Sequence, residues 1–315
     1  MASGILLLDK PRGLSSNAAL QRVRALLGGE KAGHVGSLDP LATGMLPICL
    51  GEATKIAGDL LAGRKCYRFR AQLGTLTATG DAEGAVTESA PVPSLERSQV
   101  ESTLARFLGP SQQVPPMYSA LKRDGQPLYR LARAGVTVER APRLIEIFHL
   151  RLLALEPNAL ELEVLCSKGT YVRVLAEDIA RALGTLGHVS LLRREYVEPF
   201  AGAAMHTLES LEKARATGEW PALLPPDAPL GHLPAVHLEP QAAYRLRQGQ
   251  AVAVAAAAGA PGASRVRLYD EERFFGIGES DVAGRVHPRR LLKLEPREAD
   301  GGRPGTSSGF ATDEP

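Results

Sequence analysis

The chain of 315 residues and 33.5 kDa is long enough for about two domains of ~150 residues, with a core that needs no disulfide or structural metal. Hydrophobic residues make up 44% and charged residues 23%, proportions that exclude wholesale disorder. The longest uncharged apolar run, residues 251–258, is far shorter than the ~20 residues of a membrane helix. The first four residues lack the basic region of a signal peptide, so we expect neither a membrane span nor secretion.

Cysteine usage and charge distribution narrow the class of protein further. Cys49, Cys66 and Cys166 are widely spaced and odd in number, which favours neither a disulfide framework nor a zinc site and is typical of a reducing cytoplasm. The net charge of +2 is unevenly spread. Residues 1–70 carry ten Lys and Arg against five Asp and Glu, and residues 111–155 carry seven against three. Two basic segments indicate either a local anionic partner or two solvated faces, and charge alone does not separate them.

The amino-terminal elements have clear boundaries. Residues 4–8 are a continuous apolar run, typical of a short buried strand, and residues 9–13 form a turn. Ser15 or Ser16 can cap a helix with apolar residues at helical spacing, and Gly28 ends it.

The middle of the chain alternates between strands and helices. Residues 67–76 predict a strand, and Ser94 can cap a helix that closes at Gly109. Residues 160–166 alternate apolar and polar, as in a half-buried strand, and residues 170–183 predict a helix.

The carboxy-terminal third predicts a separate, smaller unit. Five prolines between residues 221 and 234 indicate an interdomain linker. Short strands separated by Gly and Asp turns are then expected near residues 235–238, 250–254, 265–269, 273–278 and 289–294. After about Arg297 the composition predicts a disordered tail.

The segment richest in chemical information is residues 33–47. Its glycines and prolines exclude a regular helix or central strand. At its centre Asp39 precedes Pro40 and is flanked by Leu38 and Leu41. Asp39 can simply cap a turn, which is ordinary chemistry for an Asp-Pro pair. A carboxylate between leucines in a rigid loop can instead be a partly desolvated nucleophile or base.

Several motifs, in order, resemble the TruB family of bacterial tRNA pseudouridine synthases over about residues 4–295. The motifs are residues 4–13 (GILLLDKPRG), 33–44 (GHVGSLDPLATG), 65–68 (KCYR), 79–81 (TGD), 115–122 (PPMYSALK), 166–173 (CSKGTYVR), 191–194 (LLRR), 276–279 (GIGE) and 284–290 (GRVHPRR).

This resemblance implies a fold and a division into domains. We expect an α/β (α+β) catalytic domain with a mixed, mostly antiparallel sheet over residues 1–228, including an RNA-binding insertion at about 117–143. A small β-rich, PUA-like RNA-binding domain is expected over 229–296, with residues 297–315 as the disordered tail.

The resemblance also assigns catalytic roles. Asp39 matches the family's nucleophile, Arg173 the arginine that pairs with it, and Tyr67 the tyrosine against the flipped base. Without the resemblance, Arg173 fits a surface pair with Glu177 four residues later on a helix. By its pattern alone, Tyr67 equally fits a strand aromatic in the core.

Four further residues match substrate-binding positions. His34 matches the histidine that fills the gap left by the flipped uridine, and Tyr171 and Leu192 match residues that sandwich the base. Lys10 matches a residue that supports the pocket. On composition alone, His34 is a loop histidine without a role, and Tyr171 and Leu192 pass as core residues.

The implied activity is isomerisation of uridine to pseudouridine at position 55 in the T-loop of tRNA, with no cofactor and no metal. Expected partners are the tRNA T-arm stem-loop and no membrane, and we expect a cytoplasmic monomer. The insertion interleaves basic residues with Tyr118 and Tyr129, which suits an RNA stem-loop but also a solvated basic helix. Its basic residues are Lys122, Arg123, Arg130, Arg133, Arg140 and Arg143.

Two other classes of function stay open. One is a nucleoside glycosylase, or another uridine-isomerising specificity, on the same scaffold. The other is a tRNA-binding folding factor in which catalysis is secondary.

Overall fold

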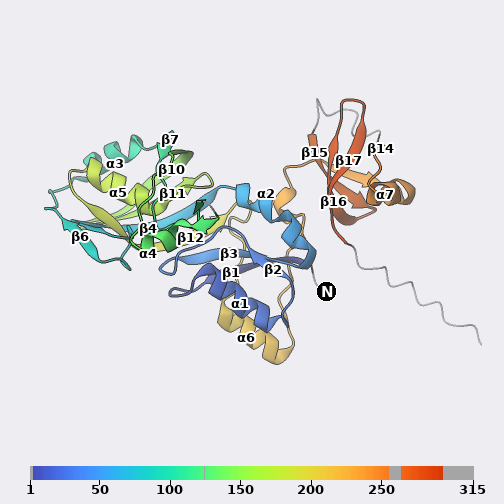
Figure 1. Ribbon diagram of the computed structural model, residues 1–315, viewed down its shortest axis with the longest axis horizontal. Coiled ribbons are helices and arrows are strands. Elements are labelled where there is room, and N and C mark those ends of the chain that lie inside the picture. Colours follow the sequence, from blue (N-terminus) through green and yellow to red (C-terminus); the bar gives the residue numbers. More distant parts are fainter. Residues whose placement is uncertain (1–2, 124, 255–263, 294–315) are drawn as a thin grey trace, which may run out of the picture.

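The computed structural model describes residues 3–123, 125–254 and 264–293, which fold around two sheets that lie apart (Figure 1). The strands of the larger sheet are β1 (Gly4–Lys10), β2 (Ala32–His34), β3 (Thr43–Leu50), β4 (Lys65–Leu73), β7 (Gly109–Gln113), β10 (Arg143–Glu156), β11 (Ala159–Cys166) and β12 (Gly187–Val197). Those of the smaller sheet are β13 (Ala235–Leu238), β14 (Val252–Ala253), β15 (Ser264–Asp270), β16 (Arg273–Ser280) and β17 (Arg285–Leu291).

Two short pairs and the helices complete the secondary structure. The short pairs are β5 (Thr75–Thr77) with β6 (Val86–Ser89), and β8 (Lys122–Arg123) with β9 (Gln126–Pro127). The α-helices are α1 (Ser16–Leu26), α2 (Ala57–Ala62), α3 (Arg97–Ala105), α4 (Leu128–Arg133), α5 (Val172–Ala182), α6 (Leu208–Thr217) and α7 (Pro240–Arg247). The 3₁₀ helices are η1 (Gly51–Ile56) and η2 (Ala228–Leu230). None of the helices in the described residues is long and apolar enough to cross a membrane.

The larger sheet is mixed and mostly antiparallel, which confirms the predicted fold class. Its strand order is β1-β3-β12-β4-β11-β10-β7, with β2 paired to the side of β3. Only the β3–β12 pairing in this sheet is parallel, and its register places Thr43 beside Arg193 and Gly44 beside Arg194. Gly44 has φ 97°, and a Cβ there would lie 2.2 Å from the Arg194 carbonyl oxygen, so only glycine allows this close approach.

The apolar run at the start of the chain is a strand buried on both faces. Leu6 and Leu8 of β1 belong to the main core, which the sheet shares with α1 and α5. Ile5 and Leu7 point to a second cluster on the opposite face. A strand covered on both sides does not alternate, because every one of its side chains is buried.

Helix boundaries match the predictions in one case and not in another. Ser15 caps α1, since its Oγ accepts a hydrogen bond from the backbone N–H of Ala18 at 3.1 Å. The predicted cap at Ser94 is wrong, because α3 begins only after Glu96 and has no side-chain cap. Gly109 does not close that helix either: it has φ 88° and begins β7.

The smaller sheet contains the expected strands, with two differences. The strand expected at residues 289–294 lies earlier, at 285–291, and a helix, α7, was missed. Pro240 occupies the first turn of α7, and Ala243 and Leu246 bury its inner face. The tail predicted after Arg297 lies outside the described residues.

The proline-rich segment expected as a linker is packed against the rest of the chain at some of its residues. Leu224 exchanges backbone hydrogen bonds with Ile5 at 2.8 and 2.9 Å. Leu230 is fully buried in a small cluster with Ile56 and Ile277, so it joins the two sheets through apolar contact. The smaller sheet is therefore connected to the rest of the chain by apolar contacts with η1 and η2 as well as by the polypeptide.

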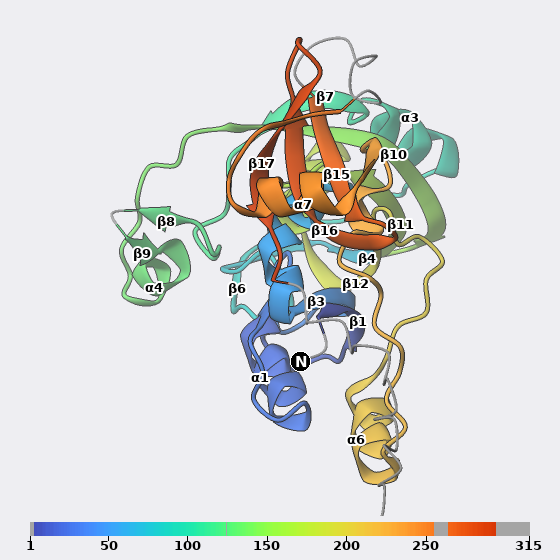
Figure 2. The ribbon, with the colours of Figure 1, turned by 90° about the vertical axis from the view of Figure 1, so that its right-hand side faces the viewer.

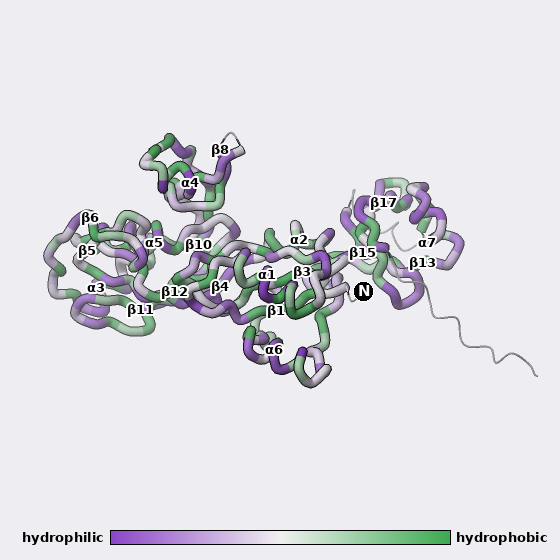
Figure 3. Tube along the Cα trace, turned by 60° about the horizontal axis from the view of Figure 1, so that its bottom comes forward, coloured by the Kyte–Doolittle hydropathy of each residue, from purple (hydrophilic) through white to green (hydrophobic). Residues whose placement is uncertain are grey.

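The segment between β7 and β10 stands apart from the larger sheet (Figures 2 and 3). It carries the β8–β9 pair and α4, covers all but the last residue of 117–143, the range expected as an insertion, and is called the insertion below. Its base is tied to the body by Arg173, whose guanidinium donates to the carbonyl of Tyr118 at 2.6 Å. The insertion is thus anchored beside the start of α5.

Candidate active site

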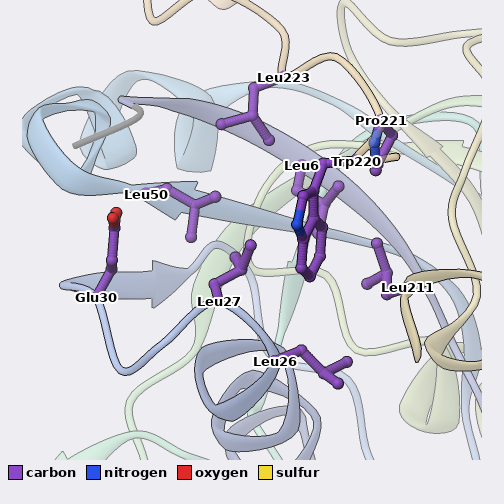
Figure 4. A pocket seen from close by; sticks show the side chains of 9 residues that line it. All are labelled: Leu6, Leu26, Leu27, Glu30, Leu50, Leu211, Trp220, Pro221 and Leu223. Carbon is purple, nitrogen blue, oxygen red and sulfur yellow. The ribbon is translucent and has the colours of Figure 1, made fainter. Parts of the chain in front are cut away.

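Two cavities are candidate binding sites. One, of about 340 Å³, lies between α1, α6 and the edge of the larger sheet (Figure 4). Trp220 and leucines line it, and Glu30 is the one ionisable side chain among its nine lining residues. The other, of about 380 Å³, opens where the loop after β2 meets β4, β12 and the start of α5. Because only this cavity gathers several ionisable and aromatic side chains, it is the candidate active site.

Asp39 and Arg173 form an ion pair at the wall of this cavity. The Nε of Arg173 lies 3.0 Å from Oδ2 of Asp39. Asp39 comes from the irregular loop after β2, and Arg173 from the first turn of α5, so the fold joins two motifs 134 positions apart. The side chain of Arg173 is only 6% exposed, whereas that of Asp39 is 42% exposed because it faces the open cavity.

Arg173 is held from several sides. Its guanidinium donates to the carbonyl oxygens of Thr79 and Tyr118, both at 2.6 Å. Its Nη1 also lies 3.6 Å from Oδ2 of the buried Asp81. Glu177, the alternative partner in the sequence, pairs instead with Arg181 at 2.9 Å on the exposed face of α5. The surface i,i+4 interpretation of Arg173 is therefore wrong.

Opposing influences set the protonation of Asp39. Burial raises the pKa of the Asp39 carboxyl, since the surrounding protein replaces much of its hydration. The Arg173 cation opposes this most strongly, Asp81 adds to the rise, and Lys10 lowers the pKa. A flat ligand that fills the cavity would remove the remaining water from the carboxylate, which makes the Arg173 charge more important still.

The three predicted base-binding side chains all line the cavity. Tyr67 is buried on β4, and burial raises the pKa of its phenol. Tyr171 caps the start of α5, and its backbone N–H and carbonyl bond the side chain of Gln113 at 2.8 and 3.2 Å. Leu192 contributes an aliphatic surface from β12. Two rings and an aliphatic group around one cavity suit a planar heterocycle.

His34 and Lys10 do not line the cavity. His34 is half-buried on β2, and its buried Nδ1 has no hydrogen-bond partner in the described residues. Burial, and then the charge of Arg194, lower its pKa, which favours a neutral ring. Lys10 is fully buried, and its Nζ donates to the carbonyls of Pro11 at 2.8 Å and Leu14 at 2.6 Å. Burial lowers the pKa of Lys10 to about 8.

Sequence reasoning gave no role to Arg194, which the structure places at the centre of the site. Arg194 is 1% exposed, and its guanidinium donates to the carbonyls of Met45 at 2.7 Å and Gly36 at 2.8 Å. It lies across from Tyr67 in the β12–β4 register. The signal was available, because Arg194 shares the face of β12 with Leu192, two residues earlier.

The arrangement of the larger sheet with its smaller companion occurs in known structures. Two solved structures share it: that titled "Crystal Structure of a Cbf5-Nop10-Gar1 Complex" has a TM-score of 0.68 at 23% identity, covering 93% of this chain and 84% of that one. The other, titled "Structure of H/ACA RNP bound to a substrate RNA containing 2'-deoxyuridine", has a TM-score of 0.69 at 21% identity, covering 94% and 86%.

Three family models match consecutive parts of the chain. Residues 24–172 match the amino-terminal domain model of "TruB family pseudouridylate synthase", 173–225 the "tRNA pseudouridylate synthase B C-terminal domain" and 234–292 "Pseudouridine synthase II TruB, C-terminal". The protein is therefore a pseudouridine synthase. It shares 53% identity with "tRNA pseudouridine synthase B" of Stutzerimonas stutzeri, over 93% of this chain and 96% of that protein. Its identity to the protein of that name from Chromohalobacter salexigens is 50%, over 92% and 94%. The chain belongs to the TruB family.

Proposed function

We propose that the protein isomerises uridine to pseudouridine at position 55 in the T-loop of tRNA, with Asp39 as the nucleophile on a flipped-out uridine. The observation that carries the proposal is the 3.0 Å pair of Asp39 and Arg173 beside a cavity of about 380 Å³. The curated relatives, whose printed name is tRNA pseudouridine synthase B, support tRNA as the substrate. We also propose that the enzyme is a monomer and acts in the cytoplasm.

The reaction asks little of the protein beyond one carboxylate and a dry site. The bond between uracil N1 and the sugar C1′ breaks, the base turns, and a bond forms from C5 to C1′. The C5 hydrogen leaves as a proton and N1 gains one, so no redox partner or group donor is needed. Asp39 can attack C1′, or stabilise and deprotonate an oxocarbenium-like sugar, as carboxylates do in glycosidases. Water must be excluded until the base rejoins.

The side chains that line the cavity would bind the uracil base. Tyr171 and Leu192 would sandwich the uracil between a ring and an aliphatic group, and Tyr67 would lie against the base. Because burial raises the pKa of Tyr67, its phenol stays protonated at neutral pH, which favours a platform or proton relay over a phenolate. His34, with its buried Nδ1 unpartnered in the described residues, would fill the space that the uridine leaves in the RNA.

The test is a direct assay on tRNA transcript that contains no modified bases. Pseudouridine is mapped by carbodiimide-stop sequencing, and we expect a single stop at uridine 55. A stop at another uridine would disprove the T-loop specificity and leave the isomerase. Free uracil would indicate a glycosylase, and binding without either product would indicate a folding factor.

The exposed arginines of α4 make a second prediction about RNA binding. Arg130 and Arg133 are exposed at the end of the insertion that stands apart from the sheet, and the guanidinium of Arg133 lies 5.8 Å from the ring centre of Tyr129 (Figure 2). Reversing both charges to Glu should weaken tRNA binding at least about tenfold. The slope of log affinity against log salt should also fall by up to about 2, since each phosphate contact contributes about 0.9.

A matched pair of reversals controls for net charge. Arg22→Glu with Lys213→Glu changes the exposed faces of α1 and α6 by the same total charge. Affinity and salt slope are measured by filter binding from 50 to 300 mM salt. Equal effects of the two double variants would favour the solvated-face interpretation of the insertion.

A further inference from the structure

Ser16 is a buried hydroxyl that faces the loop of the nucleophile. It is the first residue of α1 and is 4% exposed. Its Oγ accepts a hydrogen bond from the backbone N–H of Leu38 at 2.7 Å and donates to the carbonyl of the same residue at 3.0 Å. Leu38 directly precedes Asp39. The Ser16 side chain therefore binds both backbone polar groups of the residue next to Asp39.

The same turn holds the loop on the other side of Asp39. The backbone N–H of Gly13 donates to the carbonyl of Pro40 at 2.7 Å. The turn itself is ordered by Lys10, whose buried Nζ binds the carbonyls of Pro11 and Leu14. The β1–α1 connection and the first residue of α1 therefore hydrogen-bond to the loop on both sides of Asp39, at Leu38 and at Pro40.

We infer that Ser16 is a positioning residue for Asp39. The inference rests on the proposed role of Asp39 as the nucleophile. Ser16 does not line the cavity, so it acts through the Leu38 peptide and touches no substrate. Without the hydroxyl, the N–H and the carbonyl of Leu38 both lose their hydrogen bonds to Ser16, so the peptides on either side of Leu38 can rotate and move the carboxylate relative to Arg173 and the sugar. A displacement of about 1 Å can slow an enzymatic step about a hundredfold.

The neighbouring Ser15 offers a matched control. It stands at the same end of α1 and its hydroxyl also makes a backbone hydrogen bond, to the N–H of Ala18 at 3.1 Å. That bond caps the helix and does not reach the Asp39 loop. Ser15→Ala and Ser16→Ala thus remove the same atom from adjacent residues, and both should lower Tm.

The experiment compares single-turnover rates on saturating tRNA, together with tRNA Kd and Tm. We expect Ser16→Ala to slow the chemical step by about 10- to 100-fold with Kd within about threefold of wild type. The rate of Ser15→Ala should stay within about twofold of wild type, even if its Tm falls as far as that of Ser16→Ala. Because the defect is one of position, its size should be the same from pH 6 to 9. Ser16→Thr, which keeps the hydroxyl, should recover most of the rate.

Other outcomes overturn the inference. Equal rates for Ser15→Ala and Ser16→Ala, or a deficit that follows Tm in all variants, would reduce Ser16 to a structural role. If Ser16→Ala does not fold, Ser16→Cys tests the same point, because a thiol of similar size hydrogen-bonds weakly. Asp39→Asn is assayed beside them: if it stays active, the proposed function fails, whereas its loss together with a normal Ser16→Ala rate defeats only the positioning role.

Discussion

Asp39→Asn is expected to lower the single-turnover rate at least about a thousandfold, equivalent to about 4 kcal/mol in the barrier, while tRNA binding survives. The amide keeps the size of the side chain and can still contact Arg173, but it carries no charge to attack or stabilise the sugar carbon. The free energy of unfolding should change little, because Asp39 is open to the cavity and Arg173 keeps its contacts with Thr79, Tyr118 and Asp81.

The matched control is Glu156→Gln. The Glu156 carboxylate also binds an arginine, Arg70, with oxygen–nitrogen distances of 2.5 and 2.6 Å, but it does not line the cavity. Its rate should stay within about twofold of wild type. Activity of Asp39→Asn within tenfold of wild type would end the assignment of Asp39 as the nucleophile.

Arg173→Met should slow turnover by a factor that shrinks as pH rises. Burial already raises the pKa of Asp39, and Arg173 is the largest influence that lowers it. Removing the cation raises this pKa further, so a larger fraction of Asp39 is protonated and inert at low pH. Raising the pH through the new pKa ionises the carboxylate again. The ratio of variant to wild-type rate should therefore be lowest at pH 6 and rise toward pH 9.

Two companion variants make the result specific. Glu177→Gln, which removes only the surface pair with Arg181, should behave as wild type. Arg173→Lys keeps the charge but loses the fork that reaches Thr79 and Tyr118, so its deficit should vary less with pH. A normal rate for Arg173→Met, or an equal defect in Glu177→Gln, would refute the pairing with Asp39.

The sequence predicted a secondary-structure element well where that element is determined by neighbouring residues. The start of α1 follows from the Ser15 cap and the apolar spacing behind it, and both lie within one helix. The Ser94 cap failed because a serine before a helical pattern indicates only that a cap is possible, and the chain begins α3 later without one. The missed helix α7 spans eight residues, within one of the expected gaps between short strands.

The ion pair of Asp39 and Arg173 could not be predicted from local pattern, because the two residues meet only in the fold. Arg173, Glu177 and Arg181 repeat every four residues on α5, so spacing alone lets Glu177 pair in either direction. Burial decides: Arg173 faces inward to Asp39, and Arg181 stays on the surface with Glu177. The resemblance to a known family supplied this pairing where the physics of one helix could not.

Arg194 and Ser16 were missed for a related reason. Both bind backbone carbonyls or N–H groups of the Asp39 loop, and a backbone partner leaves no mark on the residue types of the sequence. The alternation along β12 places Arg194 on the same face as Leu192, but it does not say which backbone groups the guanidinium binds.

The short parallel pairing of β3 and β12 divides the larger sheet into an amino-terminal portion, with β1, β2 and β3, and a second portion that begins at β12. Asp39, the proposed nucleophile, lies in the connection from β2 to β3, on one side of this pairing, while Arg173 and Tyr67 lie on the other. Neither portion carries all three of the residues proposed to be catalytic, so the proposed mechanism requires both portions to be folded. Local melting of the amino-terminal portion would remove residues 36–39 from the cavity wall and leave Tyr67, Tyr171 and Leu192 in the other portion. Binding of a free base to these remaining side chains would then be a poor measure of how much active enzyme a preparation contains.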